Sequence, residues 1–184
     1  MSAQTRLSAI EADISGLAVE AIVNAANQAL IMGSGVDGAI RRKAGEGMEV
    51  ELRRIGHCPT GESVLTRGHA LPAKFVIHTV APIWSGNVSR RDAEIRLLSN
   101  CYRNSLALAR AHGISQISFP CLGTGVYGWP ADLAAHTAFA AVSDFVRNSS
   151  DIAHVIFCCF SRTDLDRYNA LITKIKSENG VARQ

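Results

Sequence analysis

The fold of this chain is decided by the stretch AIVNAAN at residues 21–27, which GSGVDG follows at residues 33–38. Residues 21–26 (Ala21–Ala26) form a short apolar run of the kind that builds a strand buried on both faces. The glycines follow this strand at a distance of six residues and open a helix, predicted over Val36–Ile55 because apolar residues recur there at three- and four-residue intervals. A strand, a glycine loop and a helix in this order indicate one unit of an α/β fold.

The same alternation recurs along the rest of the chain. Further inner strands are predicted at Lys74–Ala81, Gln116–Leu122 and His154–Phe160, and helices at Arg91–Ala111, Ala131–Val146 and Thr163–Ile175. Alternation of this kind places helices over a largely parallel sheet. Two more segments, Arg6–Ile14 and Ser63–His69, have the pattern of strands that could pair antiparallel, so we expect a mixed sheet.

Length and composition fit one domain. Of the 184 residues, 47% are hydrophobic and 19% are charged, which is enough apolar material for one buried core. We therefore predict a single domain over residues 1–184, with residues 176–184 as a polar, frayed tail. No apolar run reaches the roughly 18 residues of a membrane span, and the first residues do not resemble a signal peptide, so we expect a cytoplasmic protein without membrane contact.

The net charge of +3 suits a protein that meets a small anion. Lysine and arginine are scattered and build no stripe, so nucleic acid is not an expected partner. The five cysteines contain no CxxC pair and are odd in number, which favours reduced thiols over a disulfide framework. Because the histidines also lack close ligand pairs, we expect no metal site.

Two loops carry the strongest functional signal. GSGVDG at residues 33–38 and GTGVYG at residues 123–128 each follow a predicted strand and precede a helix. Free backbone N–H groups at such a place attract phosphate, and two loops at the carboxyl ends of parallel strands could hold both phosphates of one diphosphate. One loop alone would equally well be a structural turn. Neither is a Walker A sequence, and residues 27–32 separate the first loop from its strand, unlike a Rossmann turn.

Residues 21–27 and 33–40 resemble the signature of the MacroD-type macrodomains. The resemblance continues through LPAKFVIHTV at residues 71–80 and FPCLGTGVYGWP at residues 119–130. It implies a three-layer α/β/α sandwich around a mixed, mostly parallel sheet, with ADP-ribose lying across the top. The activity that it implies is deacetylation of O-acetyl-ADP-ribose, or removal of mono-ADP-ribose from protein carboxylates, by water attack at the distal ribose. It implies no cofactor and no metal, and partners limited to ADP-ribose, O-acetyl-ADP-ribose and ADP-ribosylated proteins.

The resemblance also implies site residues. The adenine end would be held by Asp13, Ile14 and Phe160, and Asn27 would orient the distal ribose while Asp37 activates water. A carboxylate repels the phosphates beside it, so Asp37 is better suited to accepting a proton than to attracting the ligand. The diphosphate and distal ribose would lie against the residues of the two loops: Gly33, Ser34, Gly35, Val36, Gly123, Thr124, Gly125, Val126 and Tyr127.

Each of these roles has a structural alternative that the residues alone leave open. Asp37 could serve only as a carboxylate at a helix N-terminus. Asn27 could satisfy the backbone of its own turn, and Asp13 could cap a local turn. Ile14 and Phe160 are apolar residues at the ends of strands, so packing in the core alone would explain their apolar character.

Four residues depart from the family pattern, and these departures concern the rate of reaction. Arg41 stands where MacroD-type proteins usually have histidine, and an arginine cannot act as a base but could pair with Asp37 one turn earlier. Met32 and Ser34 replace usual glycines, and Gly123 replaces a frequent serine. We expect ligand binding to survive these changes and hydrolysis to be slower or differently selective. A binding-only reader of ADP-ribose therefore stands as the alternative function.

Overall fold

A six-stranded sheet forms the middle layer of the computed structural model, which describes residues 5–149 and 151–181, with side chains described to residue 174. The strand order is β1-β6-β5-β2-β4-β3. The four apolar runs predicted as inner strands occupy the four inner positions. The strands are β1 (Arg6–Glu11), β2 (Ala21–Ala25), β3 (Ser63–Arg67), β4 (Phe75–Thr79), β5 (Gln116–Pro120) and β6 (His154–Cys159).

The sheet is mixed, as expected, with one antiparallel pair. β3 runs antiparallel to β4, whereas β1-β6, β6-β5, β5-β2 and β2-β4 are parallel pairs. Antiparallel pairing is therefore confirmed for β3 and wrong for β1, where Arg6 lies opposite His154 and Glu11 opposite Cys159. The apolar pattern of a strand reports which faces are buried, but not the direction of a partner almost 150 residues away.

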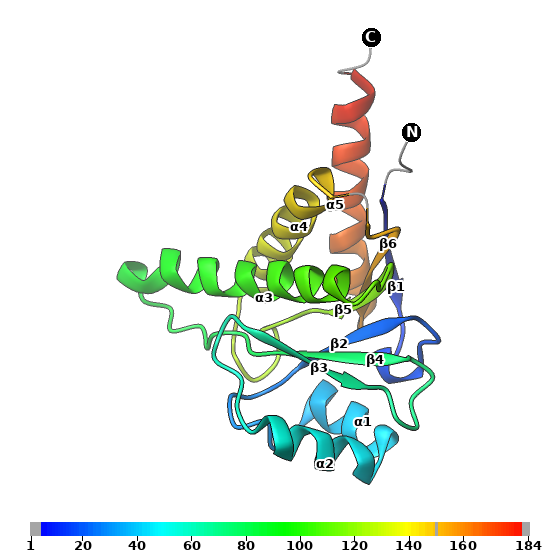
Figure 1. The fold of residues 1–184 in the computed structure, drawn as a ribbon. Helices are drawn as coiled ribbons and strands as arrows, with labels where there is room; N and C mark the ends of the chain where they lie inside the picture. Colours follow the sequence, from blue (N-terminus) through cyan, green and yellow to red (C-terminus); the bar gives the residue numbers. More distant parts are fainter. Residues whose placement is uncertain (1–4, 150, 182–184) are drawn as a thin grey trace.

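Helices cover both faces of the sheet and complete a three-layer sandwich (Figure 1). α1 (Gly35–Ala44) and α2 (Glu46–Ile55) lie on one face, and α3 (Arg91–Ala111), α4 (Ala131–Arg147) and α5 (Arg162–Val181) lie on the other. Two short 3₁₀ helices, η1 (Ile14–Gly16) and η2 (Val88–Arg90), lie in loops.

Two predicted helix boundaries are wrong. The single helix expected over Val36–Ile55 is broken at Gly45, whose φ of 82° is outside the helical range and favours glycine. α5 continues past its predicted end at Ile175 to Val181. Fraying of residues 176–184 stays a prediction. Residues 182–184 lie outside the described residues.

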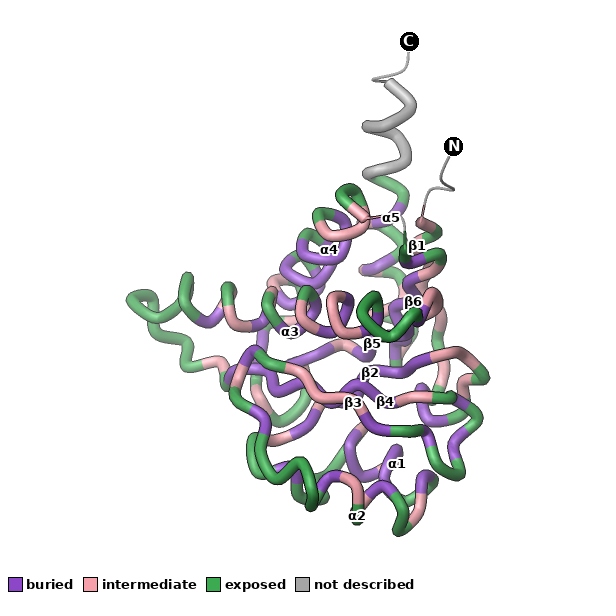
Figure 2. The backbone as a smooth tube through the Cα atoms, in the orientation of Figure 1, coloured by how far each residue is buried: buried purple, intermediate pink, exposed green. Residues whose placement is uncertain are grey.

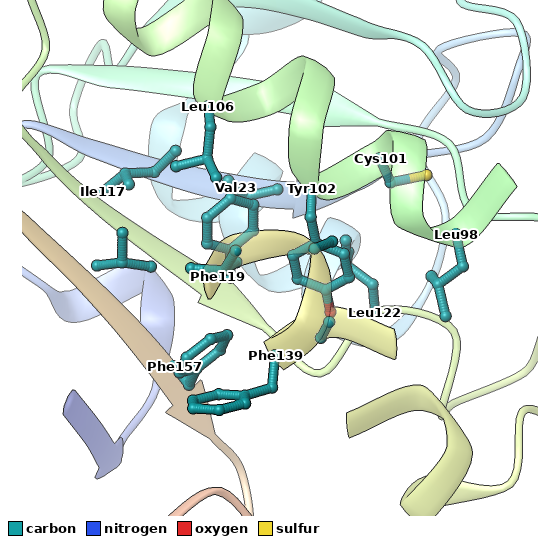
Figure 3. Packing of buried hydrophobic residues seen from close by; sticks show 14 of the residues in the cluster. Val23, Leu98, Cys101, Tyr102, Leu106, Ile117, Phe119, Leu122, Phe139 and Phe157 are labelled. Atoms are coloured by element: carbon teal, nitrogen blue, oxygen red, sulfur yellow. The ribbon is translucent and has the colours of Figure 1, made fainter. Parts of the chain in front are cut away.

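Alternate residues of the inner strands build two cores. Ile22 packs with Ile40 and Met48 beneath α1 and α2, whereas its neighbour Val23 packs with Leu106 and other residues beneath α3 and α4. Figure 3 shows the larger of the two clusters, and Figure 2 shows the buried strands running through the middle of the molecule. Strands buried on both faces leave their loops as the part of the sheet that can meet a ligand.

Five of the six strands are mutually parallel, so their carboxyl ends meet at one edge of the sheet. The loops that follow β1, β2, β5 and β6 gather there, which is the usual place for a ligand in such a sheet. Among the described residues, no helix has both the length and the apolar character that crossing a membrane requires.

Candidate functional site

A cavity of about 740 Å³ lies at the carboxyl ends of β1, β6, β5 and β2. These are four neighbouring strands, and at a spacing of about 4.8 Å they span roughly 14 Å, which suits an elongated ligand. The structure brings every predicted site residue to the wall of this cavity: Asp13, Ile14, Asn27, Gly33, Ser34, Gly35, Val36, Asp37, Gly123, Thr124, Gly125, Val126, Tyr127 and Phe160.

The strand order also arranges these residues along the cavity. Asp13 follows β1, Phe160 follows β6, the second glycine loop follows β5, and Asn27 and the first loop follow β2. The residues expected to hold adenine and those expected to act on the distal ribose therefore lie at opposite ends, with a glycine loop between them.

The first glycine loop presents unpaired backbone N–H groups. Helix α1 begins at Gly35 with Ser34 as its N-cap, and the Ser34 side chain makes no capping hydrogen bond. The N–H groups of a first helical turn have no acceptor within the helix, so those of Gly35 and Val36 are available to an anion. Gly35 has a φ of 57°, whereas Ser34 has an extended backbone with a φ of −104°. Serine is therefore accommodated at position 34 without backbone strain.

The second glycine loop has the same property. Within the described part of the chain, no hydrogen bond uses the backbone N–H of Gly125, Val126 or Tyr127. Gly123 has a φ of 83°, and a Cβ there would lie 2.6 Å from Cδ1 of Trp129. Glycine in place of the family's frequent serine is thus explained by the position of the Trp129 ring.

The charge of the cavity decides how it can hold an anion. Among the described residues, its wall includes Asp13, Asp37 and Asp164 but no lysine, arginine or histidine. A diphosphate here would be bound by backbone N–H groups rather than by cationic side chains.

Asp37 is buried, with only 4% of its surface exposed, and its carboxylate accepts hydrogen bonds from three described donors. Its Oδ1 accepts from Nδ2 of Asn24 at 2.6 Å and from Nε of Arg41 at 3.1 Å. Its Oδ2 accepts from the backbone N–H of Gly33 at 2.6 Å. Oδ2 therefore has one described partner and, beside the cavity, keeps capacity for a further donor such as water.

Gly33 keeps the space beside this carboxylate open. A Cβ at Gly33 would lie 3.3 Å from Oδ2 of Asp37 and 3.8 Å from Nδ2 of Asn27. The two catalytic candidates thus face the same small volume, which a reacting group could occupy only while residue 33 lacks a side chain.

Asn27 braces the loop that leads to Gly33. Its Nδ2 donates to the carbonyl of Ile31 at 2.7 Å, and its Oδ1 accepts from the N–H of Ile31 at 3.2 Å. The structure therefore shows the turn-stabilising role that the residues alone left open. Its role in orienting ribose stays a prediction.

The adenine-end candidates differ in exposure. Oδ1 of Asp13 accepts from the backbone N–H and the hydroxyl of Ser15, and these bonds lower the pKa of Asp13. Ile14 is buried, as a core residue would be, but Phe160 is 86% exposed. The interpretation of Phe160 as a core residue is therefore wrong, because its ring projects from the end of β6 beside the cavity.

Sequence reasoning missed Asp164 and Cys158, which also line the cavity. The spacing of Ser161 and Asp164 is that of a capping box, and Asp164 donates its N–H to the Ser161 hydroxyl at 3.2 Å. That signal predicts the start of α5, but nothing local indicates that the carboxylate reaches the cavity.

The cysteines at the cavity are unsuited to act as nucleophiles. A hydrogen bond with Cys159 and burial raise the pKa of Cys121, and burial raises that of Cys158 to about 12. A thiol must ionise to attack, so neither is reactive near neutral pH. Among the described residues, no group of three or more histidine, cysteine or acidic side chains is arranged to hold a metal ion.

Comparison with known proteins places these features in context. The model of the Macro domain family matches residues 23–138. A macro domain-containing protein of Chlorobaculum tepidum is 51% identical over 160 residues, covering 87% of this chain and 91% of that protein. An O-acetyl-ADP-ribose deacetylase of Escherichia fergusonii is 43% identical, covering 93% of this chain and 97% of that protein.

Two further similarities concern activity and ligand. The ADP-ribose glycohydrolase MACROD2 of Xenopus laevis is 42% identical over 176 residues, covering 95% of this chain and 42% of that protein. The solved structure of an Oceanobacillus iheyensis macrodomain with ADP superposes with a TM-score of 0.89 at 36% identity, covering 97% of this chain and 95% of that one.

Proposed function

Because the chain belongs to the macro domain family, we propose that it binds ADP-ribose and hydrolyses an ester or glycosidic bond at the distal ribose. The observation that carries this proposal is the Asp37 carboxylate, which lines the cavity beside two loops of unpaired backbone N–H groups. The cavity thus combines an anion-binding wall with one fixed proton acceptor.

Binding begins with the diphosphate. The N–H groups of Gly35 and Val36 and those of the second loop would each donate to phosphate oxygens. Adenine would then lie toward Asp13 and Phe160, since these follow the strands at the other end of the cavity. This placement leaves the distal ribose at the end that holds Asn27 and Asp37.

The chemical step that we propose is water attack on the acetyl carbonyl of O-acetyl-ADP-ribose. Oδ2 of Asp37 accepts a proton as the water oxygen bonds to the carbonyl carbon. The bond between that carbon and the ribose oxygen then breaks, and the proton passes to the ribose oxygen, which gives acetate and ADP-ribose. Fixing the water between a bound phosphate and Asp37 lowers the barrier by orientation.

The second substrate class is mono-ADP-ribose linked to a protein carboxylate. The ADP-ribose glycohydrolase among the relatives favours this class, because a glycohydrolase cleaves a glycosidic bond. In that case water would attack the anomeric carbon and the protein carboxylate would leave. ADP-ribosylated proteins are then partners of this chain.

A binding-only reader is the competing function, and one observation favours it. Both amide ends of Asn27 and both oxygens of Asp37 already have partners within the protein. A site whose polar groups are held by the protein, with only Oδ2 of Asp37 keeping capacity for a further donor, can bind a ligand without catalysing its hydrolysis.

Release of acetate from O-acetyl-ADP-ribose distinguishes the two functions. The parent should release acetate and ADP-ribose, and Asp37→Ala should lose on the order of 10²–10⁴-fold in kcat, the usual contribution of a general base. ADP-ribose binding by calorimetry controls for folding in both proteins. Firm binding by the parent without any turnover would refute the hydrolase and leave the reader.

We also propose that the reaction is independent of metal ions and that the protein acts in the cytoplasm. The first follows from assigning water activation to Asp37, and a chelator tests it. The second is supported by the free cysteines of the described residues, which are typical of a reducing compartment, and fractionation of cells that express the tagged chain tests it.

A further inference from the structure

Arg41 is a fully buried arginine that does not line the cavity. Its side chain is 0% exposed, and it stands one helical turn after Asp37 in α1. Arginine is almost never fully buried unless its charge is paired. This side chain therefore has partners within the protein, and they connect it to the site.

Three groups hold the guanidinium. Nε donates to Oδ1 of Asp37 at 3.1 Å, and one terminal nitrogen donates to both carboxylate oxygens of Glu49 at 2.8 and 2.9 Å. The other terminal nitrogen donates to the carbonyl of Leu30 at 2.8 Å. Arg41 thus joins the catalytic candidate on α1 to helix α2 and to the loop that follows β2.

The contact with Leu30 reaches a strained position of that loop. Leu30 is buried and has a φ of 53°, in the left-handed region that residues other than glycine seldom occupy. Such a conformation persists only where its surroundings hold it. Three residues later, the N–H of Gly33 donates to Oδ2 of Asp37. Arg41 therefore supports both oxygens of the carboxylate, Oδ1 directly and Oδ2 through the loop.

Charged or titratable side chains lie near Arg41 and Asp37 on each element packed against them. Asp37 and the exposed Arg42 belong to its own helix, Glu49 to α2, and Tyr127 to the second glycine loop near Asp37. On β4, His78 is linked to Asp37 through Asn24, whose Nδ2 lies 3.0 Å from Nδ1 of His78. Burial, and secondarily the charge of Arg41, lowers the pKa of His78 to about 3, so this histidine is neutral.

We propose that Arg41 is a positioning residue for the hydrolysis, and that its buried guanidinium holds the Asp37 carboxylate and the loop of Leu30 in place. This inference rests on the proposed function. An arginine keeps its proton throughout the physiological pH range, whereas the histidine usual at this position in the family would titrate within it.

The test compares the parent with Arg41→Met, Arg41→His and, as the matched control on the same helix, Arg42→Met. Acetate release from O-acetyl-ADP-ribose gives kcat and KM between pH 5.5 and 8.5, and calorimetry gives the Kd of ADP-ribose at the same pH values. We expect Arg41→Met to lower kcat by about tenfold or more, because a displaced carboxylate meets the water poorly. Its KM should change by less than about threefold, since the phosphate-binding loops remain. Arg42→Met, a surface change, should stay within about twofold of the parent.

The pH dependence of kcat in Arg41→His distinguishes a positioning role from a merely structural one, which would leave that dependence unchanged. Protonated imidazole replaces the buried charge and neutral imidazole does not, so kcat at pH 6 relative to pH 8 should be higher in Arg41→His than in the parent. The Kd of ADP-ribose should change between pH 6 and pH 8 by no more than in the parent, because the phosphate-binding loops remain, so the effect of pH lies in kcat.

Each outcome is decisive. Equal kcat and an equal pH profile in the parent, Arg41→Met and Arg41→His would overturn the inference while leaving the hydrolase intact. If Arg41→Met does not fold, Arg41→Lys takes its place. Lysine keeps the charge, but its ammonium cannot donate to three separate acceptors as the planar guanidinium does. An unchanged kcat in Arg41→Lys would count against the inference. If the parent binds ADP-ribose but releases no acetate, the proposed function fails and this inference fails with it, whereas an active parent with unchanged variants overturns the inference alone.

Discussion

The exposed ring of Phe160 allows ligand binding to be separated from stability. Phe160 follows β6, lines the cavity and is 86% exposed, whereas Phe157, three residues earlier, is 1% exposed. Phe160→Ala therefore removes a side chain that the fold uses little, but that would lie against adenine. Phe157→Ala removes a ring from the core.

The expected magnitudes differ between the two variants. Stacking of a base on an aromatic ring contributes about 1–3 kcal/mol, so Phe160→Ala should weaken the Kd of ADP-ribose by roughly 5- to 150-fold. Its free energy of unfolding should change by less than about 0.5 kcal/mol. Phe157→Ala should instead lower the free energy of unfolding by about 3–5 kcal/mol.

Calorimetry with ADP-ribose and urea unfolding measure the two quantities. Val88→Ala is the matched control, because Val88 is 85% exposed but lies outside the cavity wall, and its Kd should equal that of the parent. A Phe160→Ala variant that binds ADP-ribose as tightly as the parent would refute the placement of adenine at the β1 and β6 end. A large loss of stability in this variant would show that the ring packs in the fold.

Four further outcomes are expected. The pKa of His78 is lowered to about 3 from an ordinary 6.5, so the unfolded chain binds a proton at this histidine more readily than the folded protein does. The contribution of His78 to stability is therefore complete above pH 6.5 and falls by at most about 1.4 kcal/mol per pH unit below it. Urea unfolding of His78→Gln should depend less on pH between 6.5 and 4 than that of the parent. Gly33→Ala should lower kcat by roughly tenfold or more with little change in melting temperature, because its methyl group would lie 3.3 Å from Oδ2 of Asp37, and an unchanged kcat would contradict this account. Gly123→Ser should lower the free energy of unfolding by about 1–3 kcal/mol, since its Cβ would meet the Trp129 ring, and an unaltered unfolding curve would argue against this. Incubation with a chelator should leave acetate release unchanged, and loss of activity that zinc or magnesium restores would show that a metal is required.

Local patterns were sufficient for most elements of the fold. The apolar runs at residues 21–26, 74–81, 116–122 and 154–160 predicted the inner strands because a strand covered by helices on both faces needs apolar residues on both. The two glycine loops predicted where an anion would bind, since their position after a strand depends only on neighbouring residues. Periodicity failed at Gly45, where one residue outside the helical range divides a continuous apolar pattern into two helices.

The sequence by itself therefore determined the α/β class, the inner strands, the two loops and, through resemblance, the family and the residues that form the cavity wall. Only the tertiary structure decided that β1 runs parallel to β6, that Phe160 is exposed and that Asp164 reaches the cavity. It alone also decided that Arg41 is shared between Asp37 and Glu49. The physical reason is that burial patterns and turn preferences act over a few residues, whereas strand direction, exposure at a cavity and charge pairing across helices depend on contacts between segments far apart in the chain.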